Sequence, residues 1–210
     1  MADDLVITAF ASFPGVAENP TETLLGSLPD ARDEVLSNAR HVLLPTVYGR
    51  APRQLCDAMV PLPAALLMTG YSRHATGLVL EARATAACLP DRVDAAGNLP
   101  QASDAPDAQC VIDLARIAAR VTDAGLPVAI SHDAGGYVCN HLYHAALTGP
   151  CSGKDGPIGL FVHCPALSRS PLADVAAAAM DLHDMVRGLG IIARALLEAA
   201  GEPGNTLIRN

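Results

Sequence analysis

The chain has 210 residues, of which 50% are hydrophobic and 17% charged, and its formal net charge is -8 at neutral pH. This composition argues against disorder, and the length suits one ordinary domain with a substantial core. The acidic balance offers no basic surface to phosphates, so we expect no nucleic-acid partner. No run approaches the roughly 18 apolar residues of a membrane span, so we expect no membrane association.

The first four residues, Met-Ala-Asp-Asp, are acidic and do not resemble the positive start of a secretory signal. The six cysteines are irregularly spaced and lack a Cys-x-x-Cys pair, which favours free thiols over a disulfide framework. Both features lead us to expect a cytoplasmic protein.

The first half of the chain alternates strand and helix patterns. Asn19 is either an N-cap or part of a substrate pocket, and Pro20 suits the first helical position after it. The run 64–70 is apolar throughout, as in a central strand covered on both faces. We expect further strands at 5–10, 41–48 and 77–81, and a helix at 50–60 with Leu55, Cys56 and Met59 facing inward.

The second half continues the alternation after a long surface loop or lid at 89–108. We expect helices at 107–124, 137–147 and 172–200, and buried strands at 126–130 and 158–164, the second stopped by Pro165. This alternation of strand and helix patterns over residues 1–210 predicts a single α/β domain with three layers, α/β/α, around a mostly parallel sheet.

Cys139 stands where an apolar strand pattern, a glycine turn and a helix meet. In the first turn of a helix, the helix dipole and unpaired N–H groups favour a nucleophilic thiolate. A buried, inert thiol is the usual alternative for a cysteine. The turn before Cys139 and the loops after Phe10 and Gly70 are expected to share one rim of the sheet.

A thiol nucleophile needs an imidazole to take its proton and a group to orient that imidazole. His163 ends an apolar strand pattern, and Glu81 is the single carboxylate in another. A buried glutamate is costly unless it is paired, so Glu81 needs a partner. Each residue alone could be structural, but with Cys139 they form a Cys/His/Glu set.

These segments resemble the pyroglutamyl peptidase I family, the pyrrolidone carboxyl peptidases. The resemblance lies in Ser-x-x-Ala-Gly-x-Tyr-Val-Cys-Asn-His at 131–141, in the strand ending at His163, and in Asn-Pro-Thr at 19–21. It implies a cysteine peptidase that removes an N-terminal pyroglutamyl residue from peptides without metal or cofactor. The catalytic residues would be Cys139, His163 and Glu81, and the substrate-binding residues Phe10, Phe13, Asn19, Tyr71 and Val138.

Several positions depart from the family pattern. Arg73-His74-Ala75 stands in place of Gly-Gly-Arg, Cys88 in place of an arginine near the oxyanion, and Tyr71 in place of a glutamine. Two alternatives therefore stay open: an inactive binding protein on the same fold, or a hydrolase with a shifted preference for lactams or small amides.

A third alternative is a metal-dependent hydrolase. His141 and His144 are three residues apart on the expected helix and could form a zinc site with Cys139 or Asp133, but there is no His-Glu-x-x-His motif. The alanine-rich C-terminal segment leaves room for a homo-oligomer, a dimer or a tetramer.

Overall fold

The structure is a computed structural model that describes residues 4–101 and 105–202. Residues 1–3 of the acidic start and residues 102–104 of the expected loop lie outside the described residues. The strands are β1 (Leu5–Phe10), β2 (Arg40–Leu44), β3 (Ala65–Tyr71), β4 (Leu78–Glu81), β5 (Arg83–Ala84), β6 (Ala108–Gln109), β7 (Val128–Ser131), β8 (Ile158–Cys164), β9 (Ala166–Leu167) and β10 (Ala179–Met180). The α-helices are α1 (Pro20–Ser27), α2 (Glu34–Ser37), α3 (Arg50–Ala58), α4 (Leu114–Asp123), α5 (Val138–Thr148) and α6 (Leu182–Gly201), with short 3-10 turns η1 (Leu28–Asp30) and η2 (Pro171–Asp174).

Six strands form the central sheet in the order β2-β1-β3-β8-β4-β7. The first four run parallel to one another, β4 runs antiparallel to β8, and β7 runs parallel to β4. The predicted mostly parallel α/β sheet is confirmed. The run expected as a central strand is β3, which is buried along nearly all its length between β1 and β8.

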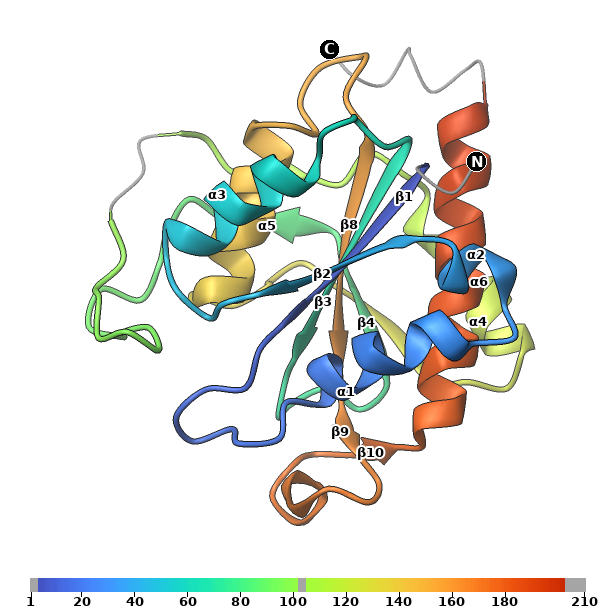
Figure 1. The fold of residues 1–210 in the computed structure, drawn as a ribbon, viewed down its shortest axis with the longest axis horizontal. Helices are drawn as coiled ribbons and strands as arrows, with labels where there is room; N and C mark the ends of the chain where they lie inside the picture. The colour runs from blue at the N-terminus through green and yellow to red at the C-terminus, as the bar shows by residue number, and fades with distance from the viewer. Residues whose placement is uncertain (1–3, 102–104, 203–210) are drawn as a thin grey trace.

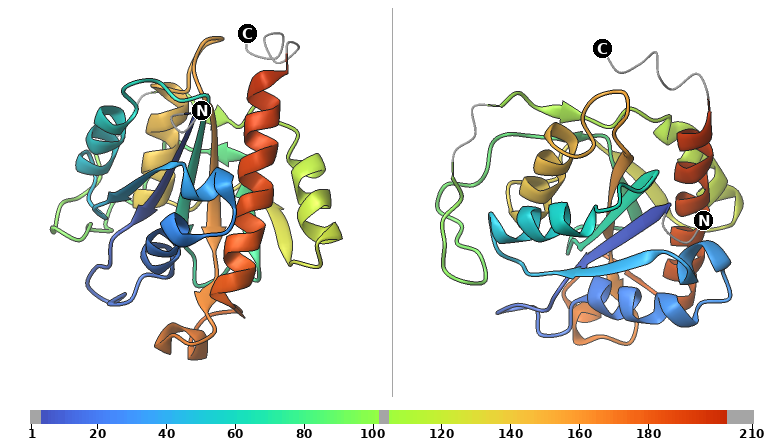
Figure 2. Two further views of the ribbon diagram at one scale, coloured as in Figure 1. Left: turned by 45° about the vertical axis from the view of Figure 1, so that its right-hand side comes forward. Right: turned by 45° about the horizontal axis from the view of Figure 1, so that its top comes forward.

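Helices cover the sheet on both faces (Figures 1 and 2). One face packs α1, α4 and α6 against alternate strand residues such as Ile7 and Leu67. The other face packs α3 and α5 against the residues between them, such as Val6 and Met68. This alternation is the two-residue period of a strand, and it produces the three predicted layers.

Local signals in the sequence set several boundaries. Asn19 caps α1, because its Oδ1 accepts a hydrogen bond from the Thr21 N–H at 3.1 Å, and Pro20 occupies the first turn as expected. Leu55 and Met59 are buried against the sheet, but Cys56 is exposed. The prediction that Cys56 faces inward was wrong: α3 ends at Ala58, and its buried side is formed by Ala51 and Leu55, one turn apart.

Two helices are shorter than predicted. The segment expected to be helical from residue 107 forms β6 first, and α4 begins only at Leu114, where the Asp113 side chain caps it. The segment expected from residue 172 forms η2 and β10 before α6 begins at Leu182. In both cases short backbone pairings formed with distant segments, β5 and β9, replace the first part of the helix.

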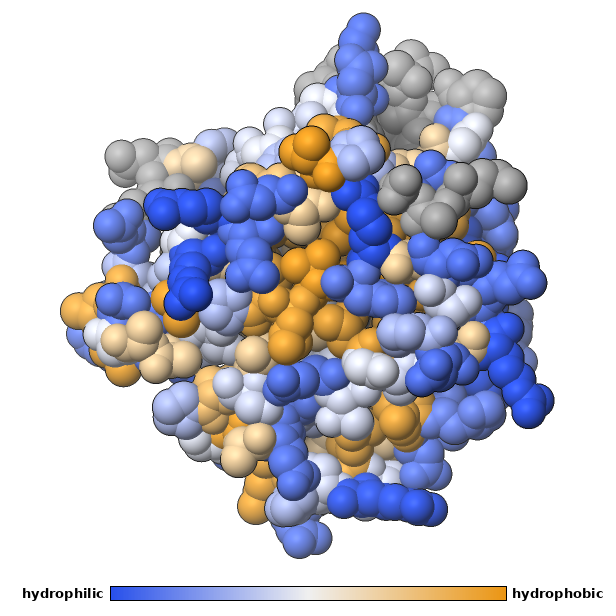
Figure 3. All heavy atoms as spheres, viewed as in Figure 1, coloured by the Kyte–Doolittle hydropathy of each residue, from blue (hydrophilic) through white to orange (hydrophobic). Residues whose placement is uncertain are grey.

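Strand β7 was expected to be buried, but it is the edge of the sheet and Ile130 is 40% exposed. An apolar run therefore did not distinguish a central strand from an edge strand. The opposite edge, β2, exposes Leu43. Apolar atoms gather near the middle of the face shown in Figure 3, which is viewed as in Figure 1, where β2 crosses the front of the sheet. Within residues 4–101 and 105–202, none of the helices combines the length and apolarity needed to span a bilayer.

Candidate active site

Strand pairing places Glu81 and His163 side by side. Val79 lies opposite His163 in the antiparallel pair β4–β8, and Glu81 is two residues farther along β4. Residues two apart on a strand share a face, so Glu81 and His163 are diagonal neighbours, close enough for long side chains to meet. His163 Nδ1 lies 2.7 Å from Glu81 Oε1.

Both members of this pair are buried, with 8% of His163 and 2% of Glu81 exposed. Burial by itself lowers the pKa of His163, but hydrogen bonds to Cys139 and Glu81, and the negative charges that these groups carry, outweigh it and raise the pKa to about 9. The imidazole is therefore protonated at neutral pH. Because Nδ1 is held by Glu81, the other ring nitrogen, Nε2, is left for Cys139.

Cys139 reaches this pair from the opposite layer. It is the second residue of α5, which starts at Val138 after a turn that includes Gly135 at a φ of 77°. The N–H groups in the first turn of a helix lack partners within the helix and point toward its N-terminal end. The Tyr143 hydroxyl donates a hydrogen bond to the Glu81 carbonyl at 2.9 Å, and so fixes α5 against β4.

Gly70 makes room for the sulfur. A Cβ atom on this residue of β3 would lie 2.9 Å from Cys139 Sγ and 2.8 Å from the Phe161 ring. Any larger residue would therefore push against both the thiol and a fully buried ring. The close approach of α5 to the sheet requires glycine at this position.

A pocket of about 540 Å³ opens beside Cys139. We call it the aromatic cavity, because Phe10, Phe13, Tyr71 and Tyr137 contribute to its wall. The shared rim predicted from the sequence is confirmed, since the loops after β1 and β3 and the turn before α5 all reach this pocket. Its other lining residues are Pro14, Gly15, Val16, Asn19, Thr46, Arg73, Arg92, Cys139, Leu172 and Val175.

A second pocket, of about 450 Å³, adjoins the first and contains the histidine; we call it the histidine cavity. Glu81, His163, His74 and Asp133 line it, together with the glycine turn before α5. Five residues line both cavities: Tyr71, Arg73, Arg92, Tyr137 and Cys139. Cys139 therefore lies at the junction of the aromatic cavity and the histidine cavity.

The turn before α5 reaches this rim of the sheet, but not because it follows the carboxyl end of a strand parallel to β1 and β3, as we expected. The loops after β1 and β3 follow the carboxyl ends of parallel strands, but β7 runs in the opposite direction. Glu81 pairs with Ser131, the last residue of β7, on one side and with Phe161, in the middle of β8, on the other. Strand β7 therefore ends beside the middle of β8. The turn at 132–137 then brings α5 back over the sheet face.

Of the eight predicted site residues, seven are placed together. Cys139, His163 and Glu81 meet as described, and Phe10, Phe13, Asn19 and Tyr71 line the aromatic cavity. Val138 differs, since it is fully buried in the core beneath α5 and lines neither cavity.

Sequence reasoning missed how the 85–98 loop is attached beside the site. Asn140, next to the cysteine, is fully buried, and its amide bonds the backbone of Thr85 and Ala87. Asp94 is also buried and accepts hydrogen bonds from the N–H groups of Tyr48 and Asn98. The only signal in the sequence is the Asp-Ala-Ala-Gly-Asn stretch at 94–98, whose residue types are typical of a turn.

The residues of the suggested zinc site have separate surroundings. His141 Nδ1 lies 3.9 Å from Cys88 Sγ, whereas His144 Nε2 bonds the Pro106 carbonyl at 2.9 Å. Across the described parts of the chain, no three His, Cys, Asp or Glu side chains converge as metal ligands would. None of the six cysteines forms a disulfide.

The sequence match to known proteins extends over nearly the whole chain. A family model described as pyroglutamyl peptidase matches residues 3–199. The chain belongs to the pyroglutamyl peptidase family. It is therefore a member of a family of hydrolases. The pyrrolidone-carboxylate peptidase of Streptococcus suis is 28% identical over 207 residues, which cover 92% of each chain. That of Gloeobacter violaceus is 27% identical over 199 residues, 91% of this chain and 96% of the other.

Solved structures of this family share the fold. Pyroglutamyl peptidase I from Bacillus amyloliquefaciens superimposes with a TM-score of 0.81 at 24% identity, covering 94% of this chain and 97% of its own. Pyrrolidone carboxyl peptidase from Pyrococcus furiosus superimposes with a TM-score of 0.81 at 20% identity, covering 93% and 99%.

Proposed function

We propose that the protein is a cysteine exopeptidase that hydrolyses the amide bond after an N-terminal pyroglutamyl residue, with Cys139, His163 and Glu81 as its catalytic residues. The observation that carries this proposal is that Cys139 lines the same cavity as the hydrogen-bonded pair Glu81–His163, raises the pKa of that histidine, and also lines the adjoining aromatic cavity. Membership of the pyroglutamyl peptidase family supports the same reaction.

The aromatic cavity suits a blocked N-terminus. A pyroglutamyl ring is small, flat and uncharged, and Phe10, Phe13 and Tyr71 offer it aromatic surfaces. Among the described residues, the side chains lining this cavity include no carboxylate that could pair with a free α-ammonium group, and its permanently charged members, Arg73 and Arg92, would repel one. Asn19 adds a polar group to the same wall.

The chemistry follows from the positions of the groups. The Cys139 sulfur attacks the carbonyl carbon of the pyroglutamyl residue, and N–H groups in the first turn of α5 stabilise the resulting oxyanion. Protonated His163 gives its Nε2 proton to the departing amine, which leaves a thioester on the sulfur. The neutral imidazole then takes a proton from water, whose oxygen attacks the thioester, and pyroglutamate is released.

Glu81 acts on the histidine. Its carboxylate accepts the Nδ1 hydrogen bond at 2.7 Å, which fixes the ring orientation and stabilises the imidazolium form. The proposed reaction requires no metal or organic cofactor, because the three side chains supply the nucleophile, the proton carrier and its orienting group.

A fluorogenic pyroglutamyl amide tests this proposal. We expect turnover that iodoacetamide abolishes and that a chelator leaves unchanged. Turnover lost only with the chelator would instead support a metal-dependent hydrolase.

The departures from the family pattern favour two other candidate functions. Cys88 and Tyr71 stand where family members commonly carry other residues, so an inactive binding protein or a hydrolase for related lactams could use the same fold. Absence of turnover on any N-blocked amide, with slow alkylation of Cys139, would support the binding protein. Turnover confined to amides other than pyroglutamyl would support the shifted hydrolase.

Two further properties stay predictions. We propose a cytoplasmic location, consistent with six cysteines that form no disulfide. A homo-oligomer, either a dimer or a tetramer, is tested by light scattering of the purified protein.

A further inference from the structure

The junction of the two cavities has an unusual charge for this protein. The chain carries a net charge of -8, yet two of the five side chains shared by both cavities are arginines. Within the described residues, neither Arg73 nor Arg92 has a carboxylate within ion-pair distance. Other arginines do have such partners, as in the pairs Arg83–Asp107, Arg116–Glu202, Arg120–Glu198, Arg187–Asp184 and Arg194–Asp33.

Arg92 is held in place. Its guanidinium lies 4.3 Å from the centre of the Tyr137 ring, two residues before Cys139. Its carbonyl accepts a hydrogen bond from the Tyr48 hydroxyl at 3.3 Å, and the Tyr137 hydroxyl donates to the neighbouring Val93 carbonyl at 3.2 Å. A guanidinium stacked on a ring keeps its N–H edge free for another partner.

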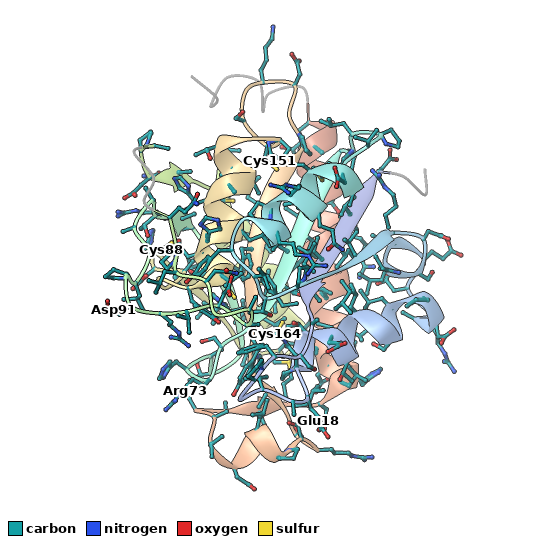
Figure 4. All side chains as sticks on the ribbon, turned by 60° about the vertical axis from the view of Figure 1, so that its left-hand side comes forward. Glu18, Arg73, Cys88, Asp91, Cys151 and Cys164 are labelled. Carbon is teal, nitrogen blue, oxygen red and sulfur yellow. The ribbon has the colours of Figure 1, made fainter. Side chains whose placement is uncertain are left out.

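Arg73 approaches from the other side of the junction. It belongs to the loop after β3, and the Ala177 N–H donates to its carbonyl at 2.8 Å, so the segment before β10 supports this loop. Figure 4 shows Arg73 projecting outward on the same side of the molecule as the loop that carries Cys88 and Asp91.

The carboxylates that face this junction are already engaged. Glu81 bonds His163, and Asp133 Oδ1 accepts the Gly135 N–H at 2.9 Å within its own turn. Apart from the two arginines, Cys139 and His163, the other ionisable side chains that line the histidine cavity are His74, Tyr71 and Tyr137. In the described part of the chain, neither guanidinium group forms an ion pair, although Glu81 and Asp133 line the histidine cavity with them. Two unpaired cations beside Cys139 are a setting that attracts a carboxylate from a ligand.

We propose that Arg73 and Arg92 bind a carboxylate on the residue that follows the scissile bond, so that the preferred substrates are short pyroglutamyl peptides with an acidic second residue. This inference rests on the proposed function, because the acyl group must occupy the aromatic cavity for the next residue to reach the junction. A pyroglutamyl ring has no charge of its own, so the carboxylate must come from the leaving side.

Binding measured without turnover tests the inference directly. In the Cys139→Ala protein, calorimetry compares pyroglutamyl-glutamate with pyroglutamyl-glutamine, both amidated at the C-terminus so that the side chain is the only difference. We expect the acidic peptide to bind about tenfold more tightly at low salt, with the preference falling as salt rises. Equal affinity for the two peptides would overturn the inference.

Variants then assign the preference to its residues. When Arg73→Gln and Arg92→Gln are added to Cys139→Ala, we expect the acidic peptide to bind more weakly, so that the ratio of the two peptide affinities comes close to one. Arg73→Lys and Arg92→Lys should restore part of this ratio. Arg116→Gln, on the distant face between α4 and α6, serves as the control and should keep the ratio. If the double Gln variant weakened both peptides equally, the arginines would not recognise the carboxylate and the inference would be wrong.

Turnover of a neutral pyroglutamyl amide by the wild type separates this inference from the proposed function. No turnover, with the binding preference intact, contradicts only the proposed function. Turnover without any preference between the two peptides contradicts only the inference.

Discussion

Glu81 controls the charge of His163. The carboxylate is buried, one oxygen bonds the imidazole, and the other has no hydrogen-bond partner in the described structure. A buried carboxylate with so few partners is costly unless it faces a cation, so its ionised form and the imidazolium depend on each other. Cys139 and Glu81 together raise the pKa of His163 to about 9 against the effect of burial, so Glu81 is one of the two groups that favour the imidazolium.

Neutralising the carboxylate is therefore expected to impair catalysis. Glu81→Gln keeps the size of the side chain but removes the charge that stabilises the imidazolium, and we expect kcat/KM on a pyroglutamyl amide to fall about a hundredfold or more. Steady-state kinetics measure the loss, and an NMR titration should show a lower pKa for His163. Glu198→Gln, which removes a surface partner of Arg120, is the control. An unchanged rate in Glu81→Gln would remove Glu81 from the catalytic set.

At this scale the sequence indicated the residues that we propose as catalytic but not their surroundings. Cys139, His163 and Glu81 could be found because each is an ionisable residue at the end of an apolar pattern or inside one. Gly70 and Asn140 could not, because their roles depend on which segments approach them in space. Gly70 was only the end of a strand in the sequence, whereas in the fold it lies against the nucleophile.

Among the elements, α5 and β3 determine the position of the sulfur. The helix approaches the sheet at Gly70, where a Cβ atom would meet both Cys139 Sγ and the Phe161 ring. A rigid strand in the middle of the sheet cannot move away easily, so the helix must yield.

Gly70→Ala is therefore expected to displace the nucleophile. We predict a loss of stability of about 1–3 kcal/mol from overpacking, together with at least a tenfold fall in kcat/KM. Urea unfolding and steady-state kinetics measure the two effects. Gly26→Ala on α1 is the matched control, because a Cβ atom there meets nothing within 4 Å. Full activity in Gly70→Ala would show that α5 is not constrained by β3.

The loop at 85–98 depends on Asp94. Its carboxylate accepts four hydrogen bonds of 3.0 Å or shorter, from the N–H groups of Tyr48, Ala96 and Asn98 and from the Asn98 amide. Burial alone raises the pKa of Asp94, but these hydrogen bonds outweigh it and the pKa is lowered.

Removing this carboxylate should loosen the loop that carries Arg92. For Asp94→Ala we expect a loss of stability of about 1–3 kcal/mol, because buried N–H groups lose their acceptor. Hydrogen exchange should also show faster exchange at residues 92–98 while α6 stays protected. Unchanged exchange in the loop would contradict its dependence on Asp94.

Helices and strands were predicted well where one apolar spacing dominated the segment. They were predicted poorly where a segment pairs with another segment that is distant in the chain. Strand β1 and helix α5 were predicted within one residue of their observed bounds, because their apolar spacing is unambiguous. The segments before α4 and α6 were predicted as helix but pair partly as short strands, β6 and β10. Pairing partners far apart in the chain are invisible to local periodicity.

At the scale of the whole molecule, the layered fold followed from alternating strand and helix patterns, and the family match supports it. The reversed direction of β4 and β7 did not follow, because an apolar run carries no sign of its direction or of its place in the sheet. This reversal is what lets Glu81 face His163 across an antiparallel pair.

The histidine pair should also affect global stability. Since the pKa of His163 is raised from 6.5 to about 9 on folding, its contribution is fully present below pH 6.5 and is lost as the pH rises through about 9. We expect the free energy of unfolding of the wild type to fall over this range more steeply than that of His163→Gln. Urea unfolding at several pH values measures both curves, and parallel curves would contradict the raised pKa.

The central claim is that Cys139 is the nucleophile of a pyroglutamyl amide hydrolase, and comparison of the wild type with Cys139→Ala tests it most directly. Initial rates on a fluorogenic pyroglutamyl amide, with both proteins shown to unfold at similar temperatures, give the result. We predict that the substitution lowers turnover by a factor of at least about a thousand, because the other members of a catalytic set cannot replace the nucleophile. Equal rates for the two proteins would contradict the claim.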